Sequence, residues 1–488
     1  MAVTQEPALR VLLVEPGYRN KYPPLGLMKL ATFHKGRGDA VAFTKGLSPK
    51  LRAERWDRVY ISTLFTFYWK RVAETAEYYA RSVADPSHIF LGGVVASLAA
   101  DDLAAETGAT VVSGLLDAKG KLGLPGDKDV DCLTPDYSII DPALNPYLNY
   151  DYPTRDAYIG YSTRGCVRKC SFCAVRHIEP NFRNGISIAA QIAAIRAAHG
   201  EKKDLLLLDN NVLASDKFAS IVDEINSSGF EAGAKLKREV KGRKIHYMRH
   251  VDFNQGVDAR LLTREKMRLL ATTAISPLRI AFDHIKYRAL YESKVRLAAE
   301  HGIRVLSNYI LFNYEDTPED FYERLRINVE LNAEFKKAGL NTHIWSFPMK
   351  YCPISGEHSR DRKYVGKHWN KKYLRGVQCI LLATHGVVGP KLDFFEAAFG
   401  RNVDKFKEII MLPEDFIIHR EKHKNRGDVA RLADLFELLP VPNQRALRSA
   451  IADGGYENAA VVHDAPAKRI AHLYNLRRRP HPGQERLF

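Results

Sequence analysis

The chain has 488 residues, of which 45% are hydrophobic and 27% are charged, and its formal net charge is +16 at pH 7. This composition excludes a fibrous repeat and a generally disordered chain, and the length predicts two or three domains. No apolar run is long enough to cross a membrane and residues 1–10 lack a signal-peptide pattern, so we expect a cytoplasmic protein without membrane contacts. Six cysteines are too few for a disulfide scaffold, and three of them within eight residues indicate a metal site in a reducing compartment.

The first 125 residues alternate apolar strands with helical stretches. Strands are expected at 10–17, 41–43, 59–63, 89–94 and 110–114, with helices at 25–35 and 69–84. This alternation predicts an α/β fold that begins with a doubly wound, Rossmann-like parallel sheet over residues 1–125. Such a sheet binds ligands at its carboxyl edge, where Gly92, Gly93 and Gly114 would lie.

Residues 126–155 are rich in Gly, Pro, Asp and Asn, which predicts a linker. The alternation then resumes over residues 156–349. Strands are expected at 158–162, 204–209, 250–254, 278–283, 303–312 and 342–347, with helices between them. About six βα units predict a partial (βα)6 TIM barrel, in which chemistry takes place at the carboxyl ends of the strands.

The last third of the chain is strongly basic. From residue 350 to the end there are 25 Lys and Arg against 16 Asp and Glu, so 25 − 16 = 9 of the 16 excess positive charges lie here. We expect a mainly helical C-terminal substrate domain over residues 350–476 and a disordered basic tail over 477–488. This charge favours a polyanionic partner such as nucleic acid, although a solvated basic surface is an equal alternative.

One stretch of this basic region mixes cations with aromatic side chains. Its members are Lys363, Lys367, His368, Trp369, Lys371, Lys372, Tyr373 and Arg375. Such a mixture suits contact with phosphates and stacking on bases, or it lines the mouth of an active site.

A single loop carries the clustered thiols Cys166, Cys170 and Cys173, in the run YSTRGCVRKCSFC that follows a predicted strand. Three thiolates would leave one iron of a 4Fe-4S cluster open to another ligand. A closed zinc site would need a fourth protein ligand, for which His177 is the candidate. The spacing alone leaves both sites open.

The C-x3-C-x2-C run, with Phe172 just before the last cysteine and a strand before the loop, resembles the signature of the radical S-adenosylmethionine (SAM) family. The resemblance implies that Cys166, Cys170 and Cys173 hold a 4Fe-4S cluster and that Phe172 packs near the adenine of SAM. It implies that an electron from the reduced cluster cleaves SAM to methionine and a 5'-deoxyadenosyl radical. The electron would come from a flavodoxin- or ferredoxin-type donor.

Later segments match the order of the family pattern. The resemblance implies SAM contacts from residues that follow the next strands, namely Asp209, Asn210, Asn211, Gln255, Asp258, Arg260 and Asp283. The first three are also an ordinary turn and helix cap, and Asp258 with Arg260 is equally a structural ion pair. Residues 308–319 resemble the fifth-strand pattern but lack its glycines. Tyr351 and Cys352, after the last predicted strand, are weak candidates for a catalytic hydrogen donor and are otherwise part of the wall.

The first domain resembles the cobalamin-binding domain that precedes many radical SAM domains. The resemblance rests on residues 22–31 and on Gly92 and Gly93, and it implies cobalamin as a carrier of methyl groups. The chain has no Asp-x-His-x-x-Gly motif in this domain, and it has Ser113-Gly114-Leu115 where a Gly-Glu pair is frequent. The alternative is therefore a domain that has lost cobalamin and serves packing or substrate binding.

The chain ends in residues 484–488, which resemble the Gln-x-x-Leu-Phe peptide by which bacterial DNA-processing proteins bind the sliding clamp. A plain disordered tail is the alternative. Taken together, the sequence predicts a radical SAM enzyme that modifies an unactivated carbon, with cobalamin-dependent methyl transfer to a nucleic acid or another anionic substrate as the leading hypothesis. The alternatives are a radical SAM tailoring enzyme for a small natural product or peptide, and a zinc-stabilised, clamp-associated DNA-binding protein.

Overall fold

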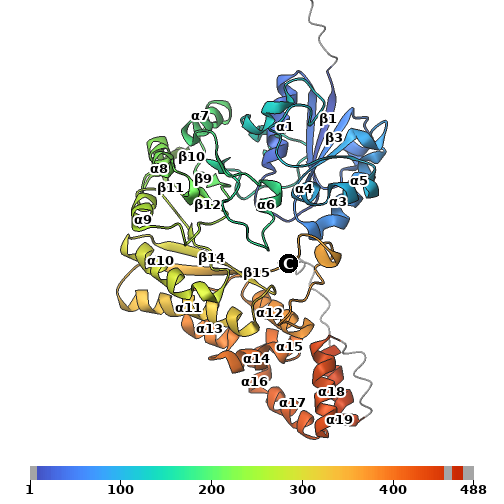
Figure 1. Ribbon diagram of the computed structural model, residues 1–488, viewed down its shortest axis with the longest axis vertical. Coiled ribbons are helices and arrows are strands. Elements are labelled where there is room, and N and C mark those ends of the chain that lie inside the picture. The colour runs from blue at the N-terminus through green and yellow to red at the C-terminus, as the bar shows by residue number, and fades with distance from the viewer. Residues whose placement is uncertain (1–7, 455–463, 476–488) are drawn as a thin grey trace, which may run out of the picture. The chain divides into compact units, whose positions relative to one another are not determined.

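The computed structural model describes residues 8–454 and 464–475 (Figure 1). These residues divide into two compact units, the first made of residues 8–278 and 352–364 and the second of residues 279–351, 365–454 and 464–475. Within the described residues, every helix is too short or too polar to cross a membrane. The predicted boundaries at 125, 155 and 349 stay predictions, and the predicted clamp-binding residues Gln484, Leu487 and Phe488 lie outside the described residues.

The first unit begins with a five-stranded sheet in the order β2-β1-β3-β4-β5, with every neighbouring pair parallel. The strands are β1 (Arg10–Glu15), β2 (Ala40–Lys45), β3 (Arg58–Thr63), β4 (Ile89–Gly93) and β5 (Thr110–Val112). The helices between them are α1 (Leu25–Gly36), α2 (Pro49–Arg52), α3 (Trp69–Ala80), α4 (Val94–Leu98) and α5 (Ala100–Thr107). The strand order is that of the flavodoxin-type doubly wound sheet, and the prediction of an α/β protein with parallel sheets is confirmed.

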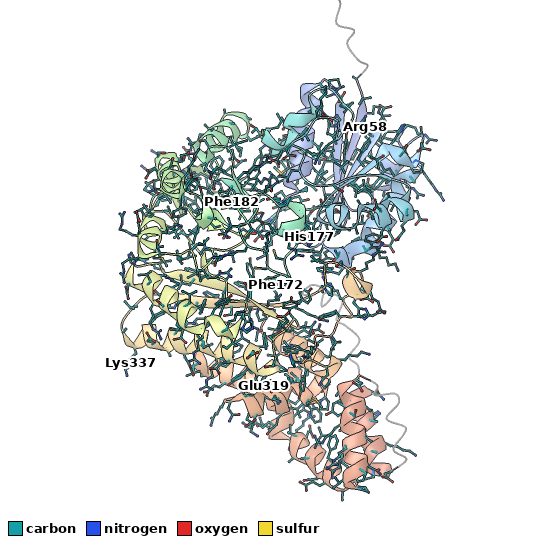
Figure 2. The ribbon with its side chains drawn as sticks, in the orientation of Figure 1. Arg58, Phe172, His177, Phe182, Glu319 and Lys337 are labelled. Carbon is teal, nitrogen blue, oxygen red and sulfur yellow. The ribbon has the colours of Figure 1, made fainter. Side chains whose placement is uncertain are left out.

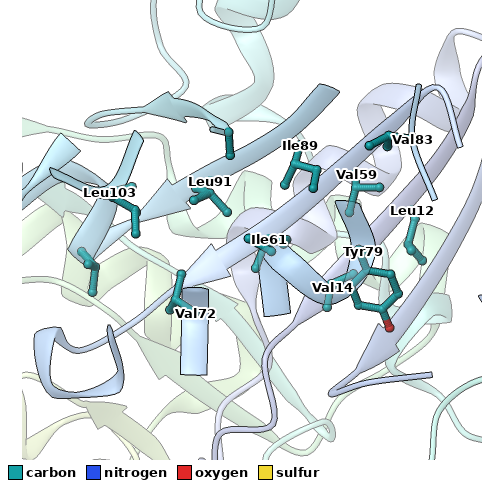
Figure 3. Packing of buried hydrophobic residues seen from close by; sticks show 14 of the residues in the cluster. Leu12, Val14, Val59, Ile61, Val72, Tyr79, Val83, Ile89, Leu91 and Leu103 are labelled. Atoms are coloured by element: carbon teal, nitrogen blue, oxygen red, sulfur yellow. The ribbon is translucent and has the colours of Figure 1, made fainter. Parts of the chain in front are cut away.

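Period-two alternation along these strands builds the core on one face of the sheet (Figure 3). Alternate apolar residues of β1, β3 and β4 point to the same face, among them Leu12, Ile61 and Leu91. They pack against α3 and α5 through Val72 and Leu103, and all five side chains are fully buried or nearly so. Each such side chain contributes about 1.5–3 kcal/mol to the free energy of folding when it is buried. This layer of side chains therefore stabilises the sheet whose carboxyl edge carries Gly92 and Gly93.

The segment 126–155 is a folded part of the first unit rather than an exposed linker. Its Tyr137 is buried, donates a hydrogen bond to the Ala157 carbonyl at 2.8 Å and accepts one from the Ile159 amide at 2.9 Å. The buried Asn145 donates to the Phe43 carbonyl at 3.0 Å. Its Gly and Pro residues therefore form irregular turns that pack between β2 and the next sheet, and composition alone could not distinguish this from a free linker.

The six strands expected for a barrel are present, but they form two three-stranded sheets. In the first unit β6 (Ala157–Gly160), β9 (Asp204–Leu207) and β12 (Val251–Phe253) are parallel, in the order β12-β9-β6. The other sheet has β13 (Leu278–Arg279), at the boundary between the units, and then β14 (Val305–Phe312) and β15 (His343–Lys350) of the second unit, in that order, with β14 and β15 parallel.

The ladders among the described residues do not join these six strands into one sheet, and the partial (βα)6 barrel stays a prediction. The chain beside β12 is the segment before β13, because the Val251 amide donates to the Ala274 carbonyl at 2.9 Å and the Ser276 amide donates to the Val251 carbonyl at 3.0 Å. Pro277 follows directly and has no amide hydrogen to continue the ladder.

Helices flank both small sheets, and two hairpin-like ladders interrupt the pattern. The helices are α7 (Ile188–His199), α8 (Phe218–Ile225), α9 (Arg264–Ala271), α10 (Arg288–Glu300) and α11 (Pro318–Lys337). Sequence analysis missed the antiparallel pair β10 (Lys235–Val240) and β11 (Arg243–Met248), and the two-residue pair β7 (Thr163–Arg164) and β8 (Arg183–Asn184).

The rest of the described chain is helical, as the sequence predicts. Its helices are α12 (Lys371–Ala383), α13 (Leu392–Phe399), α14 (Val403–Met411), α15 (Glu414–Ile418), α16 (Arg420–Asn425), α17 (Asp428–Glu437), α18 (Val441–Ala452) and α19 (Ala465–Asn475). The last helices share a buried apolar cluster that includes Phe436, Leu447 and Ile470.

Candidate functional site

The three clustered cysteines lie on one closed loop, residues 165–182, which we call the cysteine loop. It follows β6 and is closed at its base by β7, which pairs antiparallel with β8. Gly165 begins the loop at φ +73°, and a Cβ there would lie 2.3 Å from the Asn181 carbonyl oxygen, so only glycine fits. Figure 2 labels Phe172 on this loop and His177 on α6 (Val175–Ile178), the short helix after the last cysteine. Cys166, Cys170 and Cys173 are all partly buried.

Asp209 fixes the start of the cysteine loop. Its buried Oδ1 accepts hydrogen bonds from the Ser162 and Thr163 amides at 3.0 and 2.6 Å, and from their hydroxyls at 2.6 and 2.7 Å. Burial raises the pKa of Asp209, whereas these donors favour its ionised form. Asp209, two residues after the end of β9, therefore holds the chain that leads into β7 in one conformation.

The next two residues contact the cysteine loop itself. Asn210 donates to Glu179 Oε2 at 2.9 Å, and the same carboxylate accepts from the Gly165 amide at 2.7 Å. Asn211 Nδ2 lies 3.4 Å from Cys166 Sγ, to which the Arg168 amide also donates at 3.3 Å. Donors of this kind stabilise a thiolate. The run predicted to contact SAM thus has contacts that hold the cysteine loop, and its role toward SAM stays a prediction.

Asp258 ties the third strand of the sheet to the same loop. Its Oδ2 accepts from Arg168 Nε at 2.9 Å and its Oδ1 from Arg260 Nε at 2.7 Å. Burial raises the pKa of Asp258, but the hydrogen bonds from Arg260 and Arg168 outweigh burial and lower it overall. The structural ion pair that the sequence left open is therefore present and extends to the cysteine loop. Gln255 is exposed and donates to Asn254 Oδ1 at 3.2 Å.

The remaining predicted residues are divided between the units. Asp283 and Tyr351 belong to the second unit, whereas Cys352 and the cysteine loop belong to the first. The Asp283 carbonyl accepts from the fully buried Arg324 at 3.3 Å, which also pairs with Asp316 at 2.9 Å. The Tyr351 amide donates to the Phe312 carbonyl at 2.8 Å, and Cys352 is partly buried.

The donor set of the cysteine loop fits a 4Fe-4S cluster. Three thiols lie on one loop, and amide and side-chain N–H groups point at Cys166 Sγ. Within the described residues, no three His, Cys, Asp or Glu side chains converge as the ligands of a single metal ion do. The cysteines of a cluster bind different irons and need not converge in this way. The Nε2 of His177, the proposed fourth zinc ligand, lies 3.0 Å from Arg176 Nε.

A cavity of about 330 Å³ opens at the carboxyl edge of the five-stranded sheet. It lies at the ends of β3, β4 and β5 beside the start of α1, and Gly92 and Gly93 line it as the sequence predicts. Gly93 has φ +113°, and a Cβ there would lie 2.3 Å from the Thr63 carbonyl oxygen. The other walls are largely apolar, with Tyr60 and Phe90 among them. The edge predicted to bind a ligand is therefore hollow.

Charged residues line one part of this cavity and connect it to the cysteine loop. Lys29 Nζ donates to the Tyr161 hydroxyl at 2.9 Å and lies 3.7 Å from Asp131 Oδ1. Arg164 pairs with Asp131 at 2.6 Å and with Glu179 at 2.9 Å, and its guanidinium lies over the Tyr161 ring. Burial lowers the pKa of Lys29 to about 8. Sequence analysis missed Lys29, Asp131 and Glu179, because no local pattern brings residues so distant in the chain together.

Two members of the basic and aromatic stretch near residue 370 are buried, whereas Lys363, Lys367, His368, Lys371 and Arg375 are exposed. Trp369 is only 6% exposed, and its Nε1 donates to the Asp316 carbonyl at 2.9 Å. Lys372 is fully buried, and Arg375 is paired with Glu414 at 2.6 Å. Base stacking by Trp369 and phosphate contact by Lys372 are therefore wrong predictions, since charge and aromatic content do not reveal which side of α12 is buried.

Replacing Lys372 by methionine is expected to stabilise the protein near pH 7. Its Nζ has no hydrogen-bond partner among the described residues, and burial lowers its pKa to about 8 from the ordinary 10.5. Between pH 8 and pH 10.5, Lys372 keeps its proton in the unfolded chain but loses it in the folded protein. The free energy of unfolding of the natural protein therefore rises by about 3 kcal/mol as the pH increases through this range. The Met variant should lose this rise in denaturant titrations, and Lys371→Met, on the exposed side of α12, should keep it. If the free energy of unfolding rises with pH by the same amount in both variants, burial of the Lys372 amine is not its cause.

Comparison with known proteins found a similarity in structure but none in sequence. No protein-family model matches the chain, and no curated protein matches it. Among solved structures, it is similar to the radical S-adenosylmethionine methyltransferase TsrM from Kitasatospora setae, whose structure contains a tryptophan substrate and a SAM analog. The two are 15% identical, the match covers 76% of each chain, and the TM-score is 0.47. This score is too low to support an inference about the activity of this chain.

Proposed function

We propose that this protein is a radical SAM enzyme in which Cys166, Cys170 and Cys173 hold a 4Fe-4S cluster. The observation that carries the proposal is the cysteine loop, a closed loop after β6 with three thiols and with N–H donors directed at Cys166 Sγ. When bound, the cluster supplies an open iron for SAM and the electron for the cleavage of SAM.

The chain's own residues would hold this loop in one geometry. Asp209 clamps the chain before β7, Asn211 contacts Cys166, and Asp258 holds Arg168 between the first and second cysteines. These three residues follow the carboxyl ends of β9 and β12, so adjacent parallel strands support the loop from several directions. Such supporting contacts keep a reactive site precise.

Cobalamin-dependent methyl transfer is the finer proposal for the reaction. The hollow, glycine-lined edge of the first sheet supports a role in ligand binding rather than in packing alone. Its volume of about 330 Å³ accommodates an apolar portion of a large cofactor, and Lys29 and Arg164, both paired with Asp131, supply the polar part of its wall. The net charge of +16 supports an anionic substrate, for which we propose nucleic acid.

Anaerobic purification tests the proposal. We expect four irons and four sulfides per chain, and 5'-deoxyadenosine after addition of dithionite and SAM. Cobalamin absorption bands would support methyl transfer, and a cluster without them would leave a radical SAM enzyme of another kind. Zinc without iron would overturn the proposal in favour of a zinc-stabilised protein.

A further inference from the structure

We propose that the β10–β11 hairpin, residues 235–248, is a docking site for the phosphate backbone of a nucleic acid, separate from the cysteine loop. The proposal deepens the substrate part of the proposed function and rests on that part alone. It does not depend on the cluster, because nucleic-acid binding needs neither iron nor SAM.

The hairpin concentrates positive charge on an exposed ribbon. Its cations are Lys235, Lys237, Arg238, Lys241, Arg243 and Lys244, and its only carboxylate is Glu239. All but Arg238 are exposed, and among the described residues none of those five cations forms an ion pair. Like charges this close destabilise a two-stranded ribbon, and a polyanion would remove that repulsion.

The register of the hairpin separates an anchored face from a free face. Leu236 pairs with Tyr247 and Arg238 with Ile245, so these side chains share one face. Leu236 is buried, and Arg238 donates to both oxygens of Asp156 at 2.7 Å, which fixes this face to the first unit.

The opposite face carries the unpaired charge. Here Lys235 pairs with Met248, Lys237 with His246 and Glu239 with Lys244, and all six residues are exposed. Lys241 and Gly242 form the tip with φ of 51° and 76°. Arg243 begins β11 next to the tip and pairs with Val240 on the other face, where it is one more exposed cation of the hairpin.

A polar cleft of about 410 Å³ continues the basic surface at the base of the hairpin. Arg238 lines it together with Arg155, His199 and Lys202. The acidic lining residues Asp141 and Asp156 already form ion pairs with Arg155 and Arg238 at 3.2 and 2.7 Å. The cleft therefore lies beside the anchored face of the hairpin, to which Arg238 belongs.

The position of the hairpin indicates a long partner. Asp156, to which the hairpin is anchored, directly precedes β6, whereas the cysteine loop follows the other end of β6. The four residues of β6 span about 13 Å. A small substrate at the cysteine loop could not also contact the hairpin, and an electron donor docked on the hairpin would be on the wrong end of the strand.

Nucleic acid fits this surface better than other anions. A two-stranded ribbon has the width to enter the major groove of B-form DNA, and phosphates pair with lysine and arginine without a particular sequence. His246 adds an exposed ring beside the cations of the free face, which suits stacking on an exposed base.

The test compares two variants with the same change of charge. The hairpin variant carries Lys235→Gln, Lys237→Gln, Arg243→Gln and Lys244→Gln. The control carries Lys70→Gln, Lys217→Gln, Lys336→Gln and Lys337→Gln, all at exposed positions outside the hairpin. Binding to a labelled DNA duplex and to single-stranded RNA is measured by fluorescence anisotropy between 50 and 200 mM salt.

We expect the hairpin variant to lose at least about tenfold in affinity at 100 mM salt, with the slope of log affinity against log salt smaller by about 3. The control should change by less than about twofold. The preferred strand, DNA or RNA, then identifies the class of nucleic acid. Equal losses in both variants, binding without salt dependence, or binding to anionic vesicles but not to nucleic acid would overturn the proposal.

A second measurement separates this inference from the proposed function. Circular dichroism confirms that the hairpin variant is folded, and 5'-deoxyadenosine formation without substrate is measured on the same sample. Lost DNA or RNA binding with unchanged deoxyadenosine supports the docking site. Retained binding overturns it while leaving the radical SAM assignment intact, and absence of deoxyadenosine in the natural protein overturns that assignment alone.

Discussion

Replacement of Cys170 by alanine is expected to abolish iron–sulfur cluster binding and SAM cleavage together. In the proposed cluster each of the three thiolates would bind one iron, so the loss of one would leave two protein ligands and a second open iron. After anaerobic reconstitution, iron and sulfide should fall from four per chain to near zero, and 5'-deoxyadenosine should fall by more than about a hundredfold.

Cys132→Ala is the matched control for this change. Cys132 is an exposed free thiol of the first unit that lies outside the cysteine loop. The control should keep its iron, its sulfide and its deoxyadenosine formation. If Cys170→Ala keeps four irons, or if Cys132→Ala loses them as well, the cysteine loop is not the cluster site.

Replacement of Asp209 by asparagine is expected to be the most damaging change outside the cysteines. Four donors from Ser162 and Thr163 converge on Asp209 Oδ1, and Asp209 is 1% exposed. Asparagine can keep a carbonyl oxygen at the Oδ1 position, but it puts an NH2 group at Oδ2, where the Ser162 amide donates at 3.1 Å, and it removes the negative charge that the donors favour, at a cost of about 3 kcal/mol. Chemical denaturation should show this loss, and the iron content should fall because the start of the cysteine loop is released.

Asn210→Ala serves as the graded comparison. Asn210 is only partly buried and makes a single hydrogen bond to Glu179, so its loss should cost about 1 kcal/mol and leave the iron content near four. If both variants have the natural stability and iron content, the contacts at the end of β9 do not support the cysteine loop.

The sequence alone was sufficient for features that depend on neighbouring residues. The strands of the first sheet follow from apolar residues bounded by glycine and proline, and the cysteine loop from three thiols within eight residues. The glycine edge also followed from local pattern, because Gly92 and Gly93 come directly at the end of an apolar strand. These properties need no knowledge of distant contacts.

Only the tertiary structure decided what depends on distant contacts and on burial. Lys29 meets Tyr161 and Asp209 meets Thr163 across long stretches of chain, which no local pattern specifies. The hairpin at 235–248 escaped detection because its apolar alternation is short and interrupted: Leu236, Val240, Ile245 and Tyr247 share one face with Arg238 and Arg243. Burial of Lys372 could not be predicted either, because a lysine in a basic stretch is expected to be exposed to water, whereas Lys372 is buried among the helices. Sequence patterns report local geometry, whereas burial and pairing are set by whichever chain segments fold against them.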